Sequence, residues 1–238
     1  MVEKVDVSEM NNANRKHYIP HHVVVKPDST TTKLRIVYDA SAKTRKDNKS
    51  LNECLYRGPV IMEDLCGLLM RFKTKKIGIV SDIEKAFLQI GIQEDQRNVT
   101  RLLWVKDFTK PVSNDNLMVY RLAIVPFGII SSPILLGATI QHHIEKSNTP
   151  IAQKIKDNIY VYNIITGANN TGEAVELYKN TEELFKDASM NLREWLTSSK
   201  EVNSLIEQED RIETMTAKVL GLNWNMEDNE LSISTKKC

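Results

Sequence analysis

The sequence contains little of what marks specialised protein classes. Among its 238 residues are only 9 glycines and 7 prolines, and 6% of the residues are aromatic. With 41% hydrophobic and 26% charged residues the composition is that of a globular protein, which excludes collagen-like, low-complexity and disordered chains. The length fits one large domain or two small ones.

Long apolar runs and paired cysteines are also missing. No stretch approaches the ~18 consecutive apolar residues of a membrane span. Residues 1–16 are polar and lack the apolar core of a signal peptide. The three cysteines (Cys54, Cys66 and Cys238) are odd in number and widely spaced, so they predict neither a disulfide framework nor a zinc site. We therefore expect an intracellular protein of the cytoplasm or nucleus, neither secreted nor bound to a membrane.

Charge is nearly balanced overall but unevenly distributed along the chain. The net charge is +1, yet residues 1–57 carry 11 Lys or Arg against 7 Asp or Glu, whereas residues 172–238 carry 8 against 14. A pI near 7.7 lacks the basic excess that is typical of nucleic-acid binders. Charge alone therefore permits a nucleic acid as partner without indicating one.

Hydrophobic periodicity predicts a mixed α+β fold. Two-residue alternation indicates strands, and apolar residues at helical spacing indicate three helices. The predicted elements are hairpins at 17–39 and 102–122, helices at 62–72, 132–144 and 171–188, a buried strand at 77–82, a strand–turn–strand at 158–165, and strands at 190–195, 218–224 and 230–234. Residues 1–16 are predicted to form a flexible, solvated arm.

Asp82 ends the predicted buried strand and is the first candidate for chemistry. A lone Asp at a strand end is more commonly a cap or turn residue. Here it stands in the run Val80 to Ile90 (VSDIEKAFLQI), with the aromatic Phe87 five positions later. This run resembles motif A of reverse transcriptases.

Further segments resemble the other elements of that family, in the family's order. They are the fingers hairpin at 26–39 (KPDSTTTKLRIVYD), motif B at 121–133 (RLAIVPFGIISSP), motif C at 158–167 (NIYVYNIITG), motif D at 191–195 (NLREW) and motif E at 220–224 (LGLNW). Together they resemble in particular the BEL/Pao group of LTR retrotransposons, and the resemblance covers residues 17–234.

The resemblance implies a fold and a domain organisation. After the arm of residues 1–16, residues 17–238 are expected to form the fingers (about 17–60 and 92–119) and the palm (about 61–91 and 120–234) of a right-hand polymerase. The palm of that family is an antiparallel sheet backed by helices. The sequence ends soon after motif E, so we expect no thumb, connection or RNase H domain.

The resemblance also assigns roles to single residues. Asp82 and the backbone carbonyl of Ile83 are expected to hold Mg²⁺, with Mn²⁺ as an alternative, for two-metal nucleotidyl transfer. The residues expected to bind the nucleotide are Lys26, Arg35, Ile83, Phe87, Phe127 and Gly128, where Phe87 is the steric gate that favours deoxynucleotides. The expected primer grip is Leu220, Gly221, Leu222 and Trp224, with core packing as the alternative for the tryptophan. The implied partners are a primer on an RNA or DNA template and deoxynucleoside triphosphates; no oligomeric state is predicted.

Motif C departs from the family's Tyr-X-Asp-Asp pattern. Its residues here are Tyr160, Val161, Tyr162 and Asn163, so Tyr162 stands where the second metal-binding Asp of the catalytic set is expected. A phenol is protonated at neutral pH and is a poor Mg²⁺ ligand, and Asn163 offers only a neutral oxygen. We therefore expect catalysis to fall by several orders of magnitude.

Other acidic residues near the motifs are poor replacements for the missing metal-binding carboxylate of motif C. Glu84, two residues after Asp82, and Asp157, before motif C, are weak candidates for a replacement carboxylate. Glu194 in motif D stands where the family often has a basic residue, and Arg193 is expected to face the other way.

Three functions stay open from the sequence. The first is an RNA-directed DNA polymerase domain of a retrotransposon that is catalytically impaired. The second is a pseudoenzyme: a non-catalytic nucleic-acid-binding or structural relic of that fold. The third, an unrelated α+β enzyme in which Asp82 is incidental, requires all the motifs to coincide by chance.

Overall fold

The protein is described by a computed structural model in which residues 1–12, 15–27, 33–212, 214 and 216–233 are described. The chain forms two compact units, each made of two stretches of sequence. Unit 1 comprises Met1–Pro59 and Phe87–Leu135, and unit 2 comprises Val60–Ala86 and Leu136–Cys238. The names fingers and palm stay predictions for these units.

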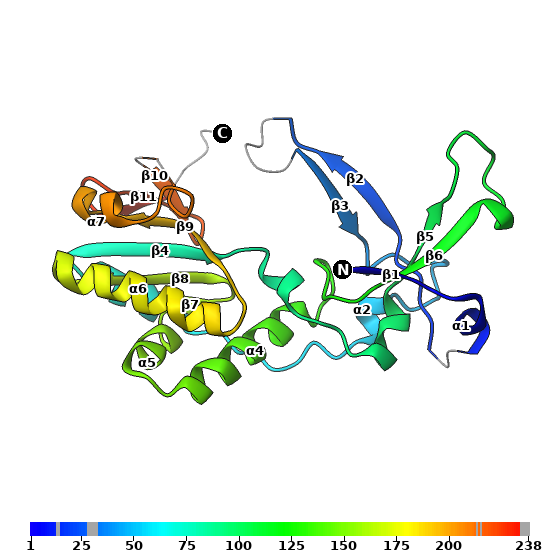
Figure 1. Cartoon of the computed structure of the whole chain (residues 1–238), viewed down its shortest axis with the longest axis horizontal. Helices are drawn as coiled ribbons and strands as arrows, with labels where there is room; N and C mark the ends of the chain where they lie inside the picture. The colour runs from blue at the N-terminus through cyan, green and yellow to red at the C-terminus, as the bar shows by residue number, and fades with distance from the viewer. Residues whose placement is uncertain (13–14, 28–32, 213, 215, 234–238) are drawn as a thin grey trace. The chain divides into compact units, whose positions relative to one another are not determined.

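Unit 1 contains a three-stranded antiparallel sheet (Figure 1). Its strand order is β1 (Val2–Lys4), β6 (Leu117–Leu122) and β5 (Arg101–Val105). Strands β5 and β6 confirm the hairpin predicted at 102–122, because they pair antiparallel with Leu103 opposite Val119.

The N-terminal residues differ from the predicted solvated arm. Strand β1 pairs with β6, α1 (Val7–Asn12) follows, and the side chain of Val5 is buried. Ion pairs fix this segment: the Arg121 guanidinium lies 3.0 Å from a Glu3 carboxylate oxygen and 2.6 Å from one of Glu9. Sequence periodicity missed the arrangement because the partners are more than a hundred residues away along the chain.

The second hairpin of unit 1 is formed by β2 (His21–Val25) and β3 (Leu34–Tyr38), as predicted. Its turn, residues 28–32, lies outside the described residues. The register places Val23 opposite Ile36 and Val24 opposite Arg35. Most of the side chains of both strands are exposed, so this ribbon contributes little to the core of the unit.

Unit 2 is built on a four-stranded antiparallel sheet (Figure 1). Its order is β7 (Ile159–Tyr160), β8 (Asn163–Ala168), β4 (Ile77–Ile83) and β9 (Leu192–Thr197). The predicted buried strand, the strand–turn–strand and the strand at 190–195 are confirmed as β4, β7–β8 and β9. Most residues of the two central strands are buried, because the sheet is covered on both sides.

One face of this sheet packs against α3 (Leu65–Lys73) and a small sheet of β10 (Thr216–Val219), β11 (Leu222–Asn225) and β12 (Glu230–Ser232). The core there includes Phe72 of α3, Leu196 of β9 and Trp224 of β11. Gly78 of β4 is needed for this packing, because a Cβ atom would lie 2.7 Å from the ring of Trp224. The side chains of Val80 and Asp82 point to the same face as this Cβ position of Gly78 through the two-residue period of a strand.

The opposite face of the sheet is covered by α6 (Thr171–Asp187), which lies along β4 and β8 (Figure 1). The ring of Tyr178 on α6 meets Trp195 of β9 edge to face, with their centroids 5.0 Å apart. The Trp195 indole N–H also donates to Glu182 of α6 at 2.6 Å. Trp195 therefore faces α6, whereas the neighbouring Leu196 faces α3.

The helices are more numerous than the three predicted. The predicted ones are α3, α6 and α4 (Ser132–Ser147), and the structure adds the short α1, α2 (Leu51–Cys54), α5 (Pro150–Lys156) and α7 (Lys200–Leu205). The described residues also form the 3₁₀ segments η1 (Ala86–Gln89), η2 (Glu94–Thr100) and η3 (Asn114–Asn116). Such short helices carry too few turns for an apolar period to be visible. Among the described residues, no helix has both the length and the apolar character needed to span a bilayer.

Candidate functional site

Asp82 lies near the end of β4, where the sheet brings three chain segments together. The register places its Cα opposite that of Asn163 on β8 and that of Arg193 on β9. Directly paired residues of neighbouring strands present their side chains on the same face. The strand that resembles motif A thus stands between the segments that resemble motifs C and D, all within unit 2.

The environment of Asp82 disfavours its negative charge. Burial raises the pKa of this carboxyl to about 6, and the nearby Glu194 carboxylate adds to the increase. Glu194 comes this close because of a β-bulge in β9: Val80 pairs with Leu196, but Asp82 pairs with Arg193, so β9 has one extra residue at this point. Glu194 occupies the bulge with a positive φ of 57°. The carboxylates of Asp82 and Glu194 therefore lie near one another, close to the end of β4.

Tyr162 lies in the tight turn between β7 and β8. Tyr160 and Asn163 pair across the turn, and the carbonyl of Tyr162 accepts a hydrogen bond from the backbone N–H of Ile83 at 2.9 Å. The side chain of Tyr162 is 37% exposed. The turn is therefore joined directly to the residue that follows Asp82.

The backbone of this turn is strained. Val161 has φ of 58°, in the left-handed region that a β-branched residue rarely adopts. Such a conformation costs on the order of 1–3 kcal/mol and occurs most often at functional sites. Two-residue hairpin turns of types I′ and II′ need a positive φ at their first central residue, so this conformation of Val161 follows from the tightness of the β7–β8 turn.

Glu84 is close in sequence but is already engaged. Its carboxylate lies 3.3 Å from the Arg193 guanidinium and 3.1 Å from the Lys85 ammonium, and it accepts a hydrogen bond from the Asn191 side chain at 3.2 Å. These contacts, first the hydrogen bond from Lys85 and then that from Asn191, lower the pKa of Glu84. Arg193 thus faces Glu84 rather than away from the site, contrary to the simple alternation expected in motif D.

The donor set at Asp82 does not fit a pair of magnesium ions. One carboxylate of the expected catalytic pair is replaced by the Tyr162 phenol, and Asp157, the other candidate, is the exposed C-cap of α5. Within the described part of the chain, no three His, Cys, Asp or Glu side chains are grouped closely enough to hold a metal ion. Asp82 and Glu194 form only a pair, and burial followed by the charge of Glu194 raises the pKa of Asp82 to about 6.

Two of the expected triphosphate ligands, Lys26 and Arg35, lie on the β2–β3 hairpin in unit 1. Their side chains are exposed, as is that of Lys33. Val24 pairs with Arg35, and the backbone N–H of Lys26 donates to the carbonyl of Lys33 at 2.7 Å, so all three cations share one face of the ribbon. Among the described residues none of the three forms an ion pair. The other face of the ribbon is apolar.

Phe87, Phe127 and Gly128 lie together in unit 1. The two phenyl rings meet edge to face with their centroids 5.0 Å apart, and Phe87 is buried whereas Phe127 is 54% exposed. Gly128 has φ of 93°, and a Cβ atom there would lie 2.7 Å from the carbonyl oxygen of Tyr38. Only glycine fits this close approach, so the Pro-Phe-Gly turn anchors the ring pair to the end of β3.

The expected primer-grip residues fall at the turn between β10 and β11. Leu220 and Gly221 have positive φ values of 49° and 88° and make this turn. The strand predicted at 218–224 is therefore wrong, because the chain reverses in its middle. Trp224 is fully buried against Phe72, and its indole N–H donates to Asn229 at 2.9 Å. A direct contact between this ring and a primer is thus excluded, and core packing is correct for Trp224.

Two elements of the site were not assigned roles from the sequence. Glu194 was recognised only as an unexpected acid, because a β-bulge leaves no clear signal in a six-residue strand. Lys33 was missed because its place on the cationic face depends on the hairpin register. The alternation Lys33–Leu34–Arg35–Ile36 was the available signal.

Comparison with known proteins supports the fold and no more than the fold. No protein-family model and no curated protein matches the sequence. Solved structures do match: the foamy viral protease-reverse transcriptase in complex with an RNA/DNA hybrid has 14% identity and a TM-score of 0.58, over 93% of this chain and 24% of that one. The corresponding dRH protein in complex with double-stranded DNA has 16% identity and a TM-score of 0.61, over 90% of this chain and 31% of that one.

A further foamy viral protease-reverse transcriptase, in complex with double-stranded DNA, has 15% identity and a TM-score of 0.59, over 92% of this chain and 37% of that one. The chain spans about a quarter to a third of the length of these proteins. Its mixed α/β fold with antiparallel sheets is therefore similar to that of reverse-transcriptase structures.

Proposed function

We propose that this chain is the reverse transcriptase domain of a BEL/Pao-type retrotransposon polyprotein, an RNA-directed DNA polymerase whose activity is strongly reduced by Tyr162. One observation carries the proposal. The register of β4 with β8 places Asp82 beside the strained turn that resembles motif C, in a fold similar to reverse transcriptases.

The proposed partner is a primer annealed to an RNA or DNA template, inside the cell. The similar foamy viral proteins have structures in complex with an RNA/DNA hybrid and with double-stranded DNA. In this chain the exposed cations Lys26, Lys33 and Arg35 offer a face for phosphate groups. Phe87 would act as the steric gate that favours deoxynucleoside triphosphates, and Phe127, which meets its ring edge to face, would support it.

Mg²⁺, or Mn²⁺ as an alternative, is the proposed metal, with weakened binding. Divalent metals supply positive charge to the reacting phosphate in this class of reaction. Asp82 and the Ile83 carbonyl would be its ligands here, yet the missing second carboxylate makes the set a poor fit for two ions. Loss of a few kcal/mol of transition-state stabilisation lowers the rate by several factors of ten.

The alternative is a non-catalytic relic that retains the fold and grips nucleic acid. Tyr162 in place of a carboxylate favours it, because every donor needed for catalysis must be present at once, whereas binding needs only the cationic surface. The two proposals share the fold and differ in whether restoring one carboxylate restores activity.

The test is primer extension on an RNA template with Mg²⁺ or Mn²⁺. The chain as it stands is compared with Tyr162→Asp, with the matched control Tyr162→Phe, and with Tyr162→Asp combined with Asp82→Asn. We expect extension by Tyr162→Asp at least a hundredfold above the other three, since ~1.4 kcal/mol corresponds to each factor of ten.

Other outcomes decide between the proposals. Equal extension by the chain and by Tyr162→Asp would contradict the assignment of Tyr162 as the lesion. Absence of extension in all four proteins, with retained primer–template binding, would favour the non-catalytic alternative. Absence of both extension and binding would contradict both proposals.

A further inference from the structure

Residues 206–212 of unit 2 lie along the outer edge of β9, the last strand of the four-stranded sheet. The backbone N–H of Trp195 donates to the carbonyl of Asp210 at 2.8 Å, and the N–H of Ile212 donates to the carbonyl of Trp195 at 3.1 Å. Arg211 forms a parallel bridge with Trp195, and the side chain of Ile206 is buried. We call residues 206–212 the β9 clasp, because they pair with the edge of β9 at Trp195.

A buried carboxyl group lies beside the residue that holds the clasp. Glu182 of α6 is 7% exposed and accepts a hydrogen bond from the Trp195 indole N–H at 2.6 Å. Its second oxygen lies 3.8 Å from the ammonium of Lys186, whose side chain is 69% exposed. Such an exposed and distant cation offsets a buried negative charge only weakly.

Acids predominate among the charged groups around this carboxyl and the clasp. Besides Glu182 itself, the titratable groups there are Tyr178 and Lys186 on α6, Arg193 on β9, and Glu207, Glu209 and Asp210 on the clasp. Burial raises the pKa of Glu182, and the charge of Asp210 adds to the increase. Burial, followed by the charge of Glu209, also raises the pKa of Asp210. Both acids therefore hold their protons more tightly in the folded chain than in the unfolded chain.

We propose that the β9 clasp is a pH-dependent element, which stays on the edge of β9 while Glu182 is protonated and opens when Glu182 and Asp210 are both ionised. A neutral Glu182 still accepts the indole hydrogen bond, and it places no second negative charge beside Asp210. Stability that comes from the neutral form is present at low pH and is lost as the pH rises through the raised pKa. The rest of the sheet would stay intact, because β9 also pairs with β4.

The opening would change what the edge of the sheet presents to solvent. It would leave the backbone N–H and carbonyl of Trp195 without their partners, and a free strand edge can pair with another strand. The clasp would therefore regulate access to the edge of β9. This proposal is independent of the proposed function, because it needs no metal, nucleotide or template.

The test is amide hydrogen exchange of the full chain, followed by NMR at pH 4 and at pH 7.5. The reporters are the backbone N–H groups of Trp195 and Ile212, which make the two hydrogen bonds of the clasp. The reference is the N–H of Ile165, which donates to the carbonyl of Asn158 at 2.8 Å elsewhere in the unit. The variant Glu182→Gln imitates the protonated carboxyl and keeps an oxygen for the Trp195 indole.

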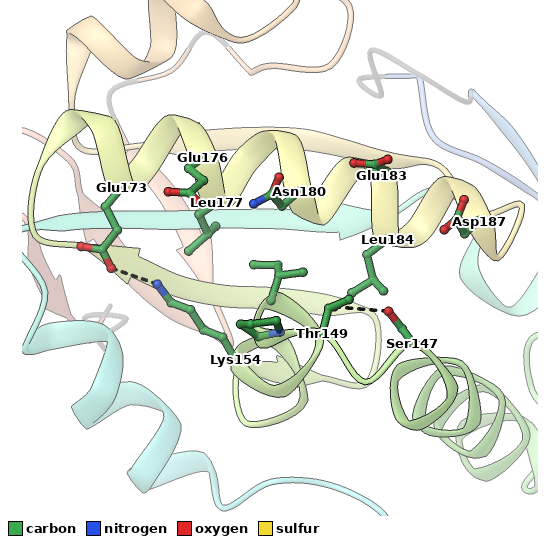
Figure 2. Close-up of a pocket in the computed structure, with 12 residues that line it drawn as sticks. Ser147, Thr149, Lys154, Glu173, Glu176, Leu177, Asn180, Glu183, Leu184 and Asp187 are labelled. Atoms are coloured by element: carbon green, nitrogen blue, oxygen red, sulfur yellow. Dashed lines mark hydrogen bonds and ion pairs between the residues drawn. The ribbon is translucent and has the colours of Figure 1, made fainter.

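The matched control is Glu183→Gln, which neutralises the next residue of the same helix. Glu183 is exposed and belongs to the lining of the pocket that Figure 2 shows, whose lining residues lie between 147 and 187 and so are not part of the clasp. Each variant is compared with the parent at the same pH, so the titration of Asp82, which all of them share, cancels.

At pH 7.5 we expect Glu182→Gln to raise the protection of Trp195 and Ile212 about fivefold or more over the parent, and at pH 4 less than about twofold. Protection of Ile165 should change less than about twofold at both pH values. Asp210→Asn should act in the same direction at pH 7.5, and it carries the test if circular dichroism shows that Glu182→Gln does not fold.

Three results would overturn the proposal. One is an equal effect of Glu182→Gln and Glu183→Gln, because neutralising any acid of α6 would then suffice. Another is a gain at pH 7.5 that Ile165 shares in full, because the whole chain and not the clasp would then respond. The third is unchanged or lower protection of Trp195 and Ile212 at pH 7.5 in the folded variants, because the ionised acids would then not open the clasp.

Discussion

Strand β4 in unit 2 carries Asp82 and the β2–β3 hairpin in unit 1 carries the cations expected to bind phosphate, and the two elements have opposite physical settings. β4 is paired on both sides and packed on both faces, and Asp82 keeps a raised pKa because its surroundings exclude water. The hairpin is paired only with itself, and Lys26, Lys33 and Arg35 on one of its faces are exposed.

The difference shows which parts of the molecule tolerate substitution. Around β4, the geometry is fixed by packing, so we expect the turn that carries Tyr162 to keep its place whichever side chain stands at position 162. In the hairpin, the three cationic side chains are exposed, and the β2–β3 register places them on one face of the ribbon. Loss of chemistry without loss of fold is therefore expected at β4, and loss of binding without loss of stability at the hairpin.

The largest expected effect concerns the tryptophans of the two units. Trp224→Ala removes a fully buried ring that packs on Phe72 and covers Gly78, and we expect a loss of ~3–5 kcal/mol in the free energy of unfolding. Trp104→Ala in unit 1 removes a ring that is 47% exposed and stacks on His21, so we expect a clearly smaller loss. Urea denaturation measures both variants, and equal losses would contradict the assignment of Trp224 to the core.

The second prediction concerns the pH dependence that Asp82 gives to stability. Its pKa is raised from its ordinary value to about 6 in the folded chain, so the folded state holds this proton more tightly than the unfolded state. Stability contributed by the neutral form is present below pH 4 and is lost as pH rises to about 6. Asp82→Asn removes this loss, and we expect the variant to be more stable than the parent by on the order of 2–3 kcal/mol at pH 7.5.

Denaturation of both proteins at pH 4 and pH 7.5 measures this difference. Glu84→Gln is the control, because contacts with Lys85 and Asn191 lower the pKa of Glu84 and neutralisation should destabilise the chain at pH 7.5. Destabilisation of Asp82→Asn at pH 7.5 would show that the carboxylate is paired in solution, contrary to the structure.

The third and smallest prediction concerns the hairpin. Lys26→Ala, Lys33→Ala and Arg35→Ala together should leave the free energy of unfolding unchanged within about 0.5 kcal/mol, since exposed unpaired cations contribute little. Primer–template affinity should fall about tenfold or more, and the slope of log affinity against log salt should fall by up to ~3.

The matched control for the hairpin is Lys146→Ala, Lys179→Ala and Lys200→Ala, three exposed lysines of unit 2. Its effect on the salt slope should be smaller than that of the hairpin variant. An identical decrease in both would mean that net charge, and not the cationic face of the ribbon, determines binding.

Much of the fold was predictable because its signals are local. The alternation in residues 33–39 and the apolar run 77–82 identify β3 and β4, and the apolar stripe of 171–188 identifies α6. The packing of residues 1–12 was not predictable, since it depends on Arg121, whose partners Glu3 and Glu9 are distant in sequence.

The residues of the candidate site were predictable where they belong to a contiguous sequence motif. They were not predictable where their position depends on the register between paired strands. The order of the motifs along the sequence assigned Asp82, Tyr162 and Asn163 to one site. In the structure, the pairing of β4 with β8 places Asp82 opposite Asn163. Glu194 could not be placed beside Asp82, because the bulge that turns it toward the site depends on pairing between β4 and β9. The burial of Trp224 likewise depends on Phe72, from a helix about 150 residues earlier in the chain.

The measurement that tests the central claim most directly is Mn²⁺ binding followed by electron paramagnetic resonance of the free ion. The account predicts weak binding by the chain as it stands and binding at least tenfold tighter by Tyr162→Asp, with the gain abolished by adding Asp82→Asn. Tight binding by the unaltered chain that is lost in Asp82→Asn would contradict the account, because it would show that Asp82 already has the ligands it needs without a carboxylate at position 162.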